Sequence, residues 1–248
     1  MDSKNPEPPA IFSFAEHVAG MRQFAGPLQE LSEAWKRQQE QIAEALRAIG
    51  RDFEKSYPQM RVACDRLADL GWTIPMEVTP RTFVGLADPL HTDADIEQML
   101  SDFYTDNDFE QLRVVQRDLV RSQALARYHS LIGEAFEAYY QGLHQIPVPA
   151  LLAIIEGLVA AETGNLNSRA VALRKLAAER EAQAPSNGLE ALMWRSARRL
   201  IDNVFADSDF SGPQPSRINR HWVLHGRDAG PWTKADAVRF FVAIHTMA

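Results

Sequence analysis

Apolar residues follow helical spacing along most of the chain, and the strict alternation of a half-buried strand is nearly absent. The clearest case lies near the N-terminus, where Leu28, Trp35, Ile42 and Ile49 fall seven residues apart. The 248 residues hold ample apolar material for a core, but this pattern offers no sheet to build it on. We therefore expect an all-α fold: an antiparallel helical bundle with an N-terminal helical extension.

Composition and the spacing of apolar residues divide the chain into three parts. The Pro-rich, polar start predicts a disordered tail over residues 1–12, and the seven-residue pattern predicts a helical extension over 13–95. The main helical domain is expected over 96–248. Its helices are predicted over residues 95–105, 108–126, 127–145, 148–163, 189–205 and 234–247.

Two threonines carry the signals of helix starts. Thr92 precedes Asp93 as a candidate N-cap, and Thr233 with Asp236 fits a capping box before the last helix. Each threonine oxygen would accept a hydrogen bond from a backbone N–H that the first turn leaves without a partner.

Cysteine content and charge narrow the function classes. Cys64 is the single cysteine, so no intrachain disulfide can form, and the start of the chain lacks the pattern of a signal peptide. The longest apolar stretch holds two prolines and Glu156, so we expect no membrane segment and a cytoplasmic protein. The net charge of −7 argues against a surface coated in basic residues, although residues 190–248 carry 8 Lys and Arg against 6 Asp and Glu.

Several common catalytic signatures are missing from the sequence. It contains no phosphate-binding loop, no dinucleotide-binding glycine motif and no G-x-S-x-G nucleophile elbow. Cys64 lies in a helix-like context without an obvious base, which favours a small core residue over a nucleophile. No cofactor and no metal are expected.

The segment 217–226, R-I-N-R-H-W-V-L-H-G, concentrates groups suited to an anionic substrate. On a continuous helix, Arg217, His221 and His225 would share one face, and Arg220 could reach round to it. Asn219 could cap the helix or bind a substrate oxygen. Gly226 is a natural terminator, so His225 would sit at a helix C-terminus, where the helix dipole favours the charged imidazole.

An arginine and a histidine in this arrangement suit phosphodiester cleavage without a metal. The imidazole can transfer a proton, and the planar guanidinium can stabilise charge that builds on the phosphate oxygens. Glu156, inside the apolar run I-I-E-G, requires a partner because an unpaired buried charge costs several kcal/mol. Candidate partners are Arg217, Arg220 and the arginines at 195–199.

Arg220 and His225 fit the R-x4-H signature of HEPN domains, which the chain resembles over about residues 96–248. His221 stands where that family typically has a polar residue, and Glu156 matches an acidic residue often kept near the catalytic pair. G-W-T-I-P at 71–75 together with N-R-H-x-x-x-H-G is also similar to a group of uncharacterised bacterial proteins.

The resemblance implies a metal-independent endoribonuclease. The RNA 2′-hydroxyl would attack its own phosphodiester to give a 2′,3′-cyclic phosphate, with His225 in proton transfer and Arg220 stabilising the transition state. Asn219, His221 and Arg217 would support the site or bind substrate. The family further implies a homodimer with the site at the interface, a toxin or phage-defence role, and an antitoxin or regulatory partner.

Two alternatives stay open at the level of the sequence. The first is a non-catalytic, HEPN-like helical module that binds a nucleotide or a protein and keeps Arg220 and His225 for structure. The second is a metal-dependent enzyme in which His221 and His225, four residues apart, share an ion with a third ligand such as Glu156.

Overall fold

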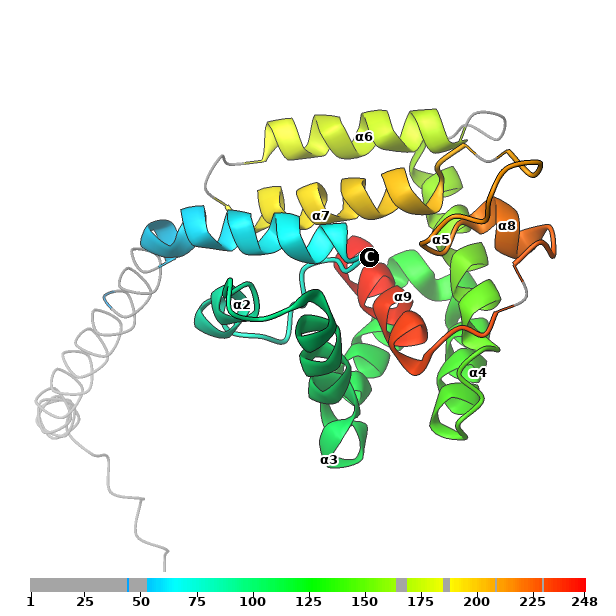
Figure 1. Cartoon of the computed structure of the whole chain (residues 1–248), viewed down its shortest axis with the longest axis horizontal. Coiled ribbons are helices and arrows are strands. Elements are labelled where there is room, and N and C mark those ends of the chain that lie inside the picture. The colour runs from blue at the N-terminus through cyan, green and yellow to red at the C-terminus, as the bar shows by residue number, and fades with distance from the viewer. Residues whose placement is uncertain (1–43, 45–52, 164–168, 185–187, 208, 229) are drawn as a thin grey trace, which may run out of the picture. The chain divides into compact units, whose positions relative to one another are not determined.

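The computed structural model describes residues 44, 53–163, 169–184, 188–207, 209–228 and 230–248. The chain forms two compact units, Met1–Phe53 and Glu54–Ala248, and almost all described residues belong to the second. Every regular element among them is helical, which confirms the expected all-α bundle (Figure 1). The predicted tail and the seven-residue stripe lie outside the described residues.

The second unit begins with a helix over residues 54–69. The later elements are α2 (Pro80–Leu86), α3 (Asp93–Arg121), the 3-10 helix η1 (Gln123–Tyr128), α4 (His129–Tyr140), α5 (Pro147–Thr163), α6 (Arg169–Gln183), α7 (Leu189–Val204), α8 (Arg220–Leu224) and α9 (Lys234–Met247).

Helix α9 forms the centre of the core. All residues from Ala237 to Ile244 are buried, and α9 packs against α3, α5 and α7, as its central position in Figure 1 shows. Phe241 stacks on Phe136 of α4 with ring centroids 3.8 Å apart. The capping box of Thr233 and Asp236 is present as predicted, and its hydrogen bonds fix where this central helix begins.

Helix α3 contains a break that the sequence prediction partly located. Asn107, Asp108 and Phe109 adopt positive φ angles of 50°, 55° and 63°, which matches the boundary expected between residues 105 and 108. The second expected boundary, at 126, was wrong because α3 already ends at Arg121 and η1 follows. Thr92 caps α3 in a full capping box, as its position predicted.

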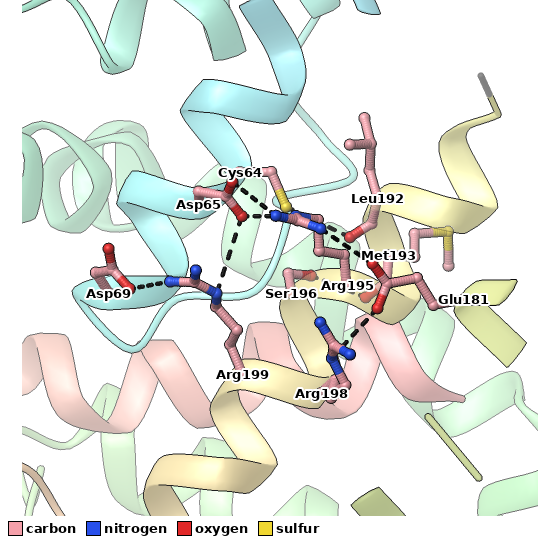
Figure 2. A network of polar contacts seen from close by, with 10 residues as sticks. All are labelled: Cys64, Asp65, Asp69, Glu181, Leu192, Met193, Arg195, Ser196, Arg198 and Arg199. Carbon is pink, nitrogen blue, oxygen red and sulfur yellow. Dashed lines mark hydrogen bonds and ion pairs between the residues drawn. The ribbon is translucent and has the colours of Figure 1, made fainter. Parts of the chain in front are cut away.

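An ion-pair network ties the 54–69 helix to α7 and α6 (Figure 2). Arg195 of α7 donates to Asp65 at 2.6 Å and 2.8 Å and to Glu181 of α6 at 3.1 Å. Figure 2 also shows Arg198 paired with Glu181, and Arg199 with Asp69. The arginines at 195–199, which the sequence offered as candidate partners of Glu156, are thus bound by acidic side chains of two other helices.

This packing places residues 54–95 in the same compact unit as the rest of the bundle. Cys64, in the middle of that helix, is buried as expected, and burial raises the pKa of its thiol to about 12. Within the described part of the chain, no helix has both the length and the apolar character needed to cross a bilayer. A HEPN-like domain that begins at residue 96 remains a prediction.

Candidate functional site

A short helix, α8, carries Arg220 and His221 and is followed by His225 as its C-cap, and Asn219 fixes where the helix begins. The Asn219 side-chain oxygen accepts a hydrogen bond from the His221 backbone N–H at 2.9 Å, and its amide nitrogen donates to the Ala206 carbonyl at 2.9 Å. Asn219 is 2% exposed. Its side chain is therefore an N-cap and an anchor to the end of α7, one of the two roles expected for it.

Arg217 lies outside α8, so the expectation that it shares a helical face with His221 and His225 was wrong. The helix begins at Arg220, after the extended residue Asn219. The Arg217 guanidinium donates to the Leu70 carbonyl at 2.8 Å. The N-cap breaks the helical register that the four-residue spacing assumed.

Arg220 forms an ion pair and hydrogen bond with Glu156 of α5. The two side chains are 18% and 17% exposed, and the Arg220 guanidinium carbon lies 5.0 Å from the centre of the Phe205 ring. The prediction that Glu156 pairs with an arginine is confirmed. Because Glu156 and Phe205 come from α5 and the end of α7, two helices fix the plane of the guanidinium.

His221 is the second neighbour of that guanidinium. Arg220 Nη2 lies 3.3 Å from His221 Nε2, and since arginine can only donate, the imidazole nitrogen must be the acceptor. Partial burial lowers the pKa of His221, with further lowering from the charges of Arg220 and His225. His221 is therefore a neutral ring at neutral pH, with its single ring proton on Nδ1.

His225 stands at the exposed end of α8, next to the predicted terminator Gly226, whose φ is +65°. Its ring lies parallel to that of His221, with centroids 6.0 Å apart and an interplanar angle of 3°. The exposed Phe210 ring approaches His225 edge-on at 5.7 Å. The structure thus aligns Glu156, Arg220, His221 and His225 in one row that runs from the bundle to the surface.

A close contact lies next to Glu156 on α5. A Cβ atom on the adjacent Gly157 would lie 1.8 Å from the Tyr128 hydroxyl oxygen, so any larger residue there would force the Tyr128 ring to move. The buried residues Leu152 and Ile155 hold the same helix in the core. Glu156 therefore projects from a rigid element, as a positioning carboxylate requires.

The sequence reasoning missed two buried polar groups. Glu77 accepts a hydrogen bond from the Tyr104 hydroxyl at 2.6 Å and lies 2.8 Å from His245 Nδ1. Arg239, inside the apolar helix α9, is 8% exposed. Arg239 could have been found by the argument applied to Glu156, since a charge within an apolar run requires a partner. No role was assigned to His245, because its partners are more than a hundred residues away in sequence.

Among the described residues, no group of three or more histidine, cysteine, aspartate or glutamate side chains is placed to hold a metal ion. Glu156, the third ligand suggested for a metal shared with His221 and His225, contacts Arg220. Comparison of the chain with protein-family models, with curated proteins and with solved structures finds no match.

Proposed function

We propose that the protein is a metal-independent endoribonuclease of the HEPN type, acting as a homodimer in the cytoplasm. RNA would be cleaved through attack of the 2′-hydroxyl, leaving a 2′,3′-cyclic phosphate and a 5′-hydroxyl. A role as a toxin or phage-defence effector, held silent by an antitoxin or regulatory partner, is part of the same proposal.

The observation that carries the proposal is the row formed by Arg220, His221 and His225. The guanidinium contacts His221, and the His221 ring is parallel to the exposed His225 ring. An oriented cation and a solvent-accessible imidazole therefore occupy one helical turn. This combination supplies transition-state charge stabilisation and proton transfer without a metal.

The chemical step assigns one task to each side chain. The 2′-oxygen forms a new bond to phosphorus and loses its proton to an imidazole, while the bond to the 5′-oxygen breaks and that oxygen gains a proton. His225 exchanges these protons, since its ring is exposed to solvent. Arg220, oriented by Glu156 and by the neutral His221, stabilises the extra charge on the phosphate oxygens.

The geometry of displacement at phosphorus favours two copies of the chain. In-line attack places the attacking and leaving oxygens on opposite sides of the phosphorus. One imidazole on a five-residue helix cannot reach both sides, so the partner subunit would supply the second His225. Phe210 and Leu224, exposed beside His225, are the apolar groups that such an interface would cover.

The test is an RNA-cleavage assay in the presence of excess EDTA, with product ends identified by mass spectrometry. The wild-type protein should give cyclic phosphate ends, and His225→Ala should lose at least about a hundredfold in rate while retaining its fold and its mass in solution. His91→Ala, which removes a histidine on the turn before α3, is the matched control and should cleave at the wild-type rate.

The other outcomes separate the alternatives. If the wild-type protein shows no cleavage, Arg220 serves to anchor α8, and a non-catalytic binding module replaces the nuclease. Activity that EDTA abolishes and divalent ions restore would instead assign the chemistry to a metal. Cleavage by a protein that remains monomeric would overturn the shared-site part of the proposal.

A further inference from the structure

A polar pocket of about 300 Å³ lies between α3, the segment leading into α8 and the start of α9. Its lining includes Glu97, Arg217, Asp228, Trp232 and Arg239, but none of Arg220, His221 or His225. Its volume is at the lower end of the range for small-molecule sites, which suits a ligand about the size of a nucleoside.

The pocket contains a buried, fixed cation. Arg239 is 8% exposed, and its two terminal nitrogens donate to Asp236 at 2.6 Å and to Glu97 at 3.0 Å. Asp236 also caps α9 through Thr233, so its oxygens already have partners. The buried ion pair therefore orients Glu97, whose side chain is 37% exposed.

A donor and an acceptor lie side by side in the lining. Arg217 is 39% exposed, and one of its nitrogens lies 3.8 Å from a Glu97 oxygen. The same nitrogen donates to the Leu70 carbonyl, and this bond holds the guanidinium in place. The pocket can therefore donate hydrogen bonds from Arg217 and accept them at Glu97 within the span of one planar ligand.

An aromatic surface of fixed orientation completes the lining. The Trp232 indole nitrogen donates to Asp228 at 3.2 Å, and Asp228 also accepts from the Gly230 backbone N–H at 3.0 Å. Asp228 is 8% exposed, and its carboxylate sets the orientation of the ring. An indole held in this way is a stacking surface for a flat base.

The charges of the pocket select among planar ligands. Glu97, Asp228 and Asp236 outnumber Arg217 and Arg239, so a phosphate group would meet net repulsion and a neutral ring would not. Guanine presents the O6 acceptor next to the N1–H and N2–H donors, which complements a guanidinium beside a carboxylate. The pyrimidines are smaller and lack this edge.

We infer that this pocket binds a purine base, with guanine preferred, through Arg217, Glu97 and Trp232. The inference deepens the proposed function and, in its RNA form, rests on it: Arg217 lies three residues before Arg220, so the base would belong to a nucleotide next to the one cleaved. A free guanine nucleoside would use the same contacts.

The experiment is isothermal titration calorimetry of the wild-type protein with guanosine, inosine, adenosine, cytidine and uridine. Guanosine should bind most tightly, inosine more weakly because it lacks the N2 amino group, and the pyrimidine nucleosides at least about tenfold more weakly. Arg217→Ala and Glu97→Gln should each weaken guanosine binding by about tenfold or more. Arg117→Ala, which removes an exposed arginine of α3, is the matched control and should bind as wild type does.

Circular dichroism verifies that each variant is folded, and the more exposed Arg217 variant decides the outcome if Glu97→Gln is unstable. Absence of guanosine binding by the wild-type protein, or binding that both variants leave unchanged, overturns the inference. Nucleosides contain no phosphodiester, so this result is independent of cleavage. Guanosine binding without nuclease activity rejects only the proposed function, and cleavage without guanosine binding rejects only the pocket.

Discussion

Arg220 of α8 and Glu156 of α5 form an ion pair across 64 residues of sequence. A helix of five residues has too few internal hydrogen bonds to hold itself in place. The pair, the Asn219 cap and the buried Trp222 fix its orientation. The Glu156 carboxylate that holds the helix also sets the direction of the Arg220 guanidinium. A change at Glu156 should therefore alter both the position of α8 and the orientation of this cation.

Replacing Glu156 with glutamine should affect both stability and activity. The substitution keeps the shape but leaves Arg220 without its counter-charge, so the free energy of unfolding should fall by about 1–3 kcal/mol. The proposed RNA cleavage should also slow, because the guanidinium loses its orientation, and Glu156→Asp should restore part of the rate. Urea denaturation and the cleavage assay measure the two effects.

The control is Glu179→Gln on α6. Glu179 is 52% exposed and lies 3.8 Å from Lys175, and exposed pairs of this kind contribute below about 1 kcal/mol. Equal losses of unfolding free energy in the two variants would show that the Glu156–Arg220 pair contributes no more to stability than an exposed ion pair does.

Two helical glycines should respond to alanine in opposite directions. Gly157→Ala places a methyl group 1.8 Å from the Tyr128 hydroxyl oxygen and should cost about 1–3 kcal/mol, whereas Gly133 has no atom within 4 Å of its added Cβ. Gly133→Ala on α4 should therefore stabilise the protein by about 0.5–1 kcal/mol through helix propensity. Thermal melts of the two single variants measure these changes in stability. Adding Tyr128→Ala to Gly157→Ala should relieve the clash and recover part of the lost stability. A neutral Gly157→Ala would contradict the close approach of η1 to α5.

Local patterns were sufficient to predict α5, α7 and α9, two caps and one ion pair. Thr92 and Thr233 start α3 and α9 because the cap chemistry lies within four residues of each. The need of Glu156 for a partner could be predicted because an unpaired charge in an apolar run is costly, and the structure supplies Arg220 from among the candidate arginines.

Features that depend on distant contacts could not be predicted in this way. Arg217 was placed on the wrong face because four-residue spacing assumes an unbroken helix, whereas Asn219, anchored to Ala206, starts α8 later. The pairing of Arg195 with Asp65 joins residues 130 apart. Such pairs follow from how the helices pack, and no local pattern encodes them.

The stability of the protein should decrease on mild acidification, with a contribution from His221. In the folded state the pKa of His221 is lowered by burial and by the neighbouring positive charges. The pKa of His144 is lowered in the same way, by burial and by the charge of Lys234. Below the ordinary histidine pKa of 6.5 the unfolded chain therefore binds more protons than the folded one, so stability is full above that pH and falls below it. The change of the free energy of unfolding with pH should stay under about 1.4 kcal/mol per pH unit for each histidine, since solvent screens both rings.

Urea denaturation at about pH 7.5 and about pH 5.5 measures this decrease, in a window above the range where carboxylates titrate. His221→Asn, whose side-chain oxygen can still accept from Arg220, should show a smaller decrease than the wild-type protein. An unchanged decrease in that variant would show that His221 titrates normally in the folded state.

Arg195→Ala should loosen the 54–69 helix. Arg195 is 18% exposed and binds both Asp65 and Glu181, so its loss leaves two half-buried carboxylates without their shared cation. We expect the free energy of unfolding to fall by about 2–4 kcal/mol, and amide hydrogens of residues 54–69 to exchange faster than those of α9. Adding Asp65→Asn should recover part of the loss, because the Asp65 carboxylate would otherwise keep only the longer contact of 3.9 Å with Arg199. Arg117→Ala, which breaks a pair whose members are 52% and 39% exposed, should cost less than about 1 kcal/mol. If exchange in the 54–69 helix stays at the wild-type rate, packing around Cys64 and Leu67 holds this helix and the ion pairs do not.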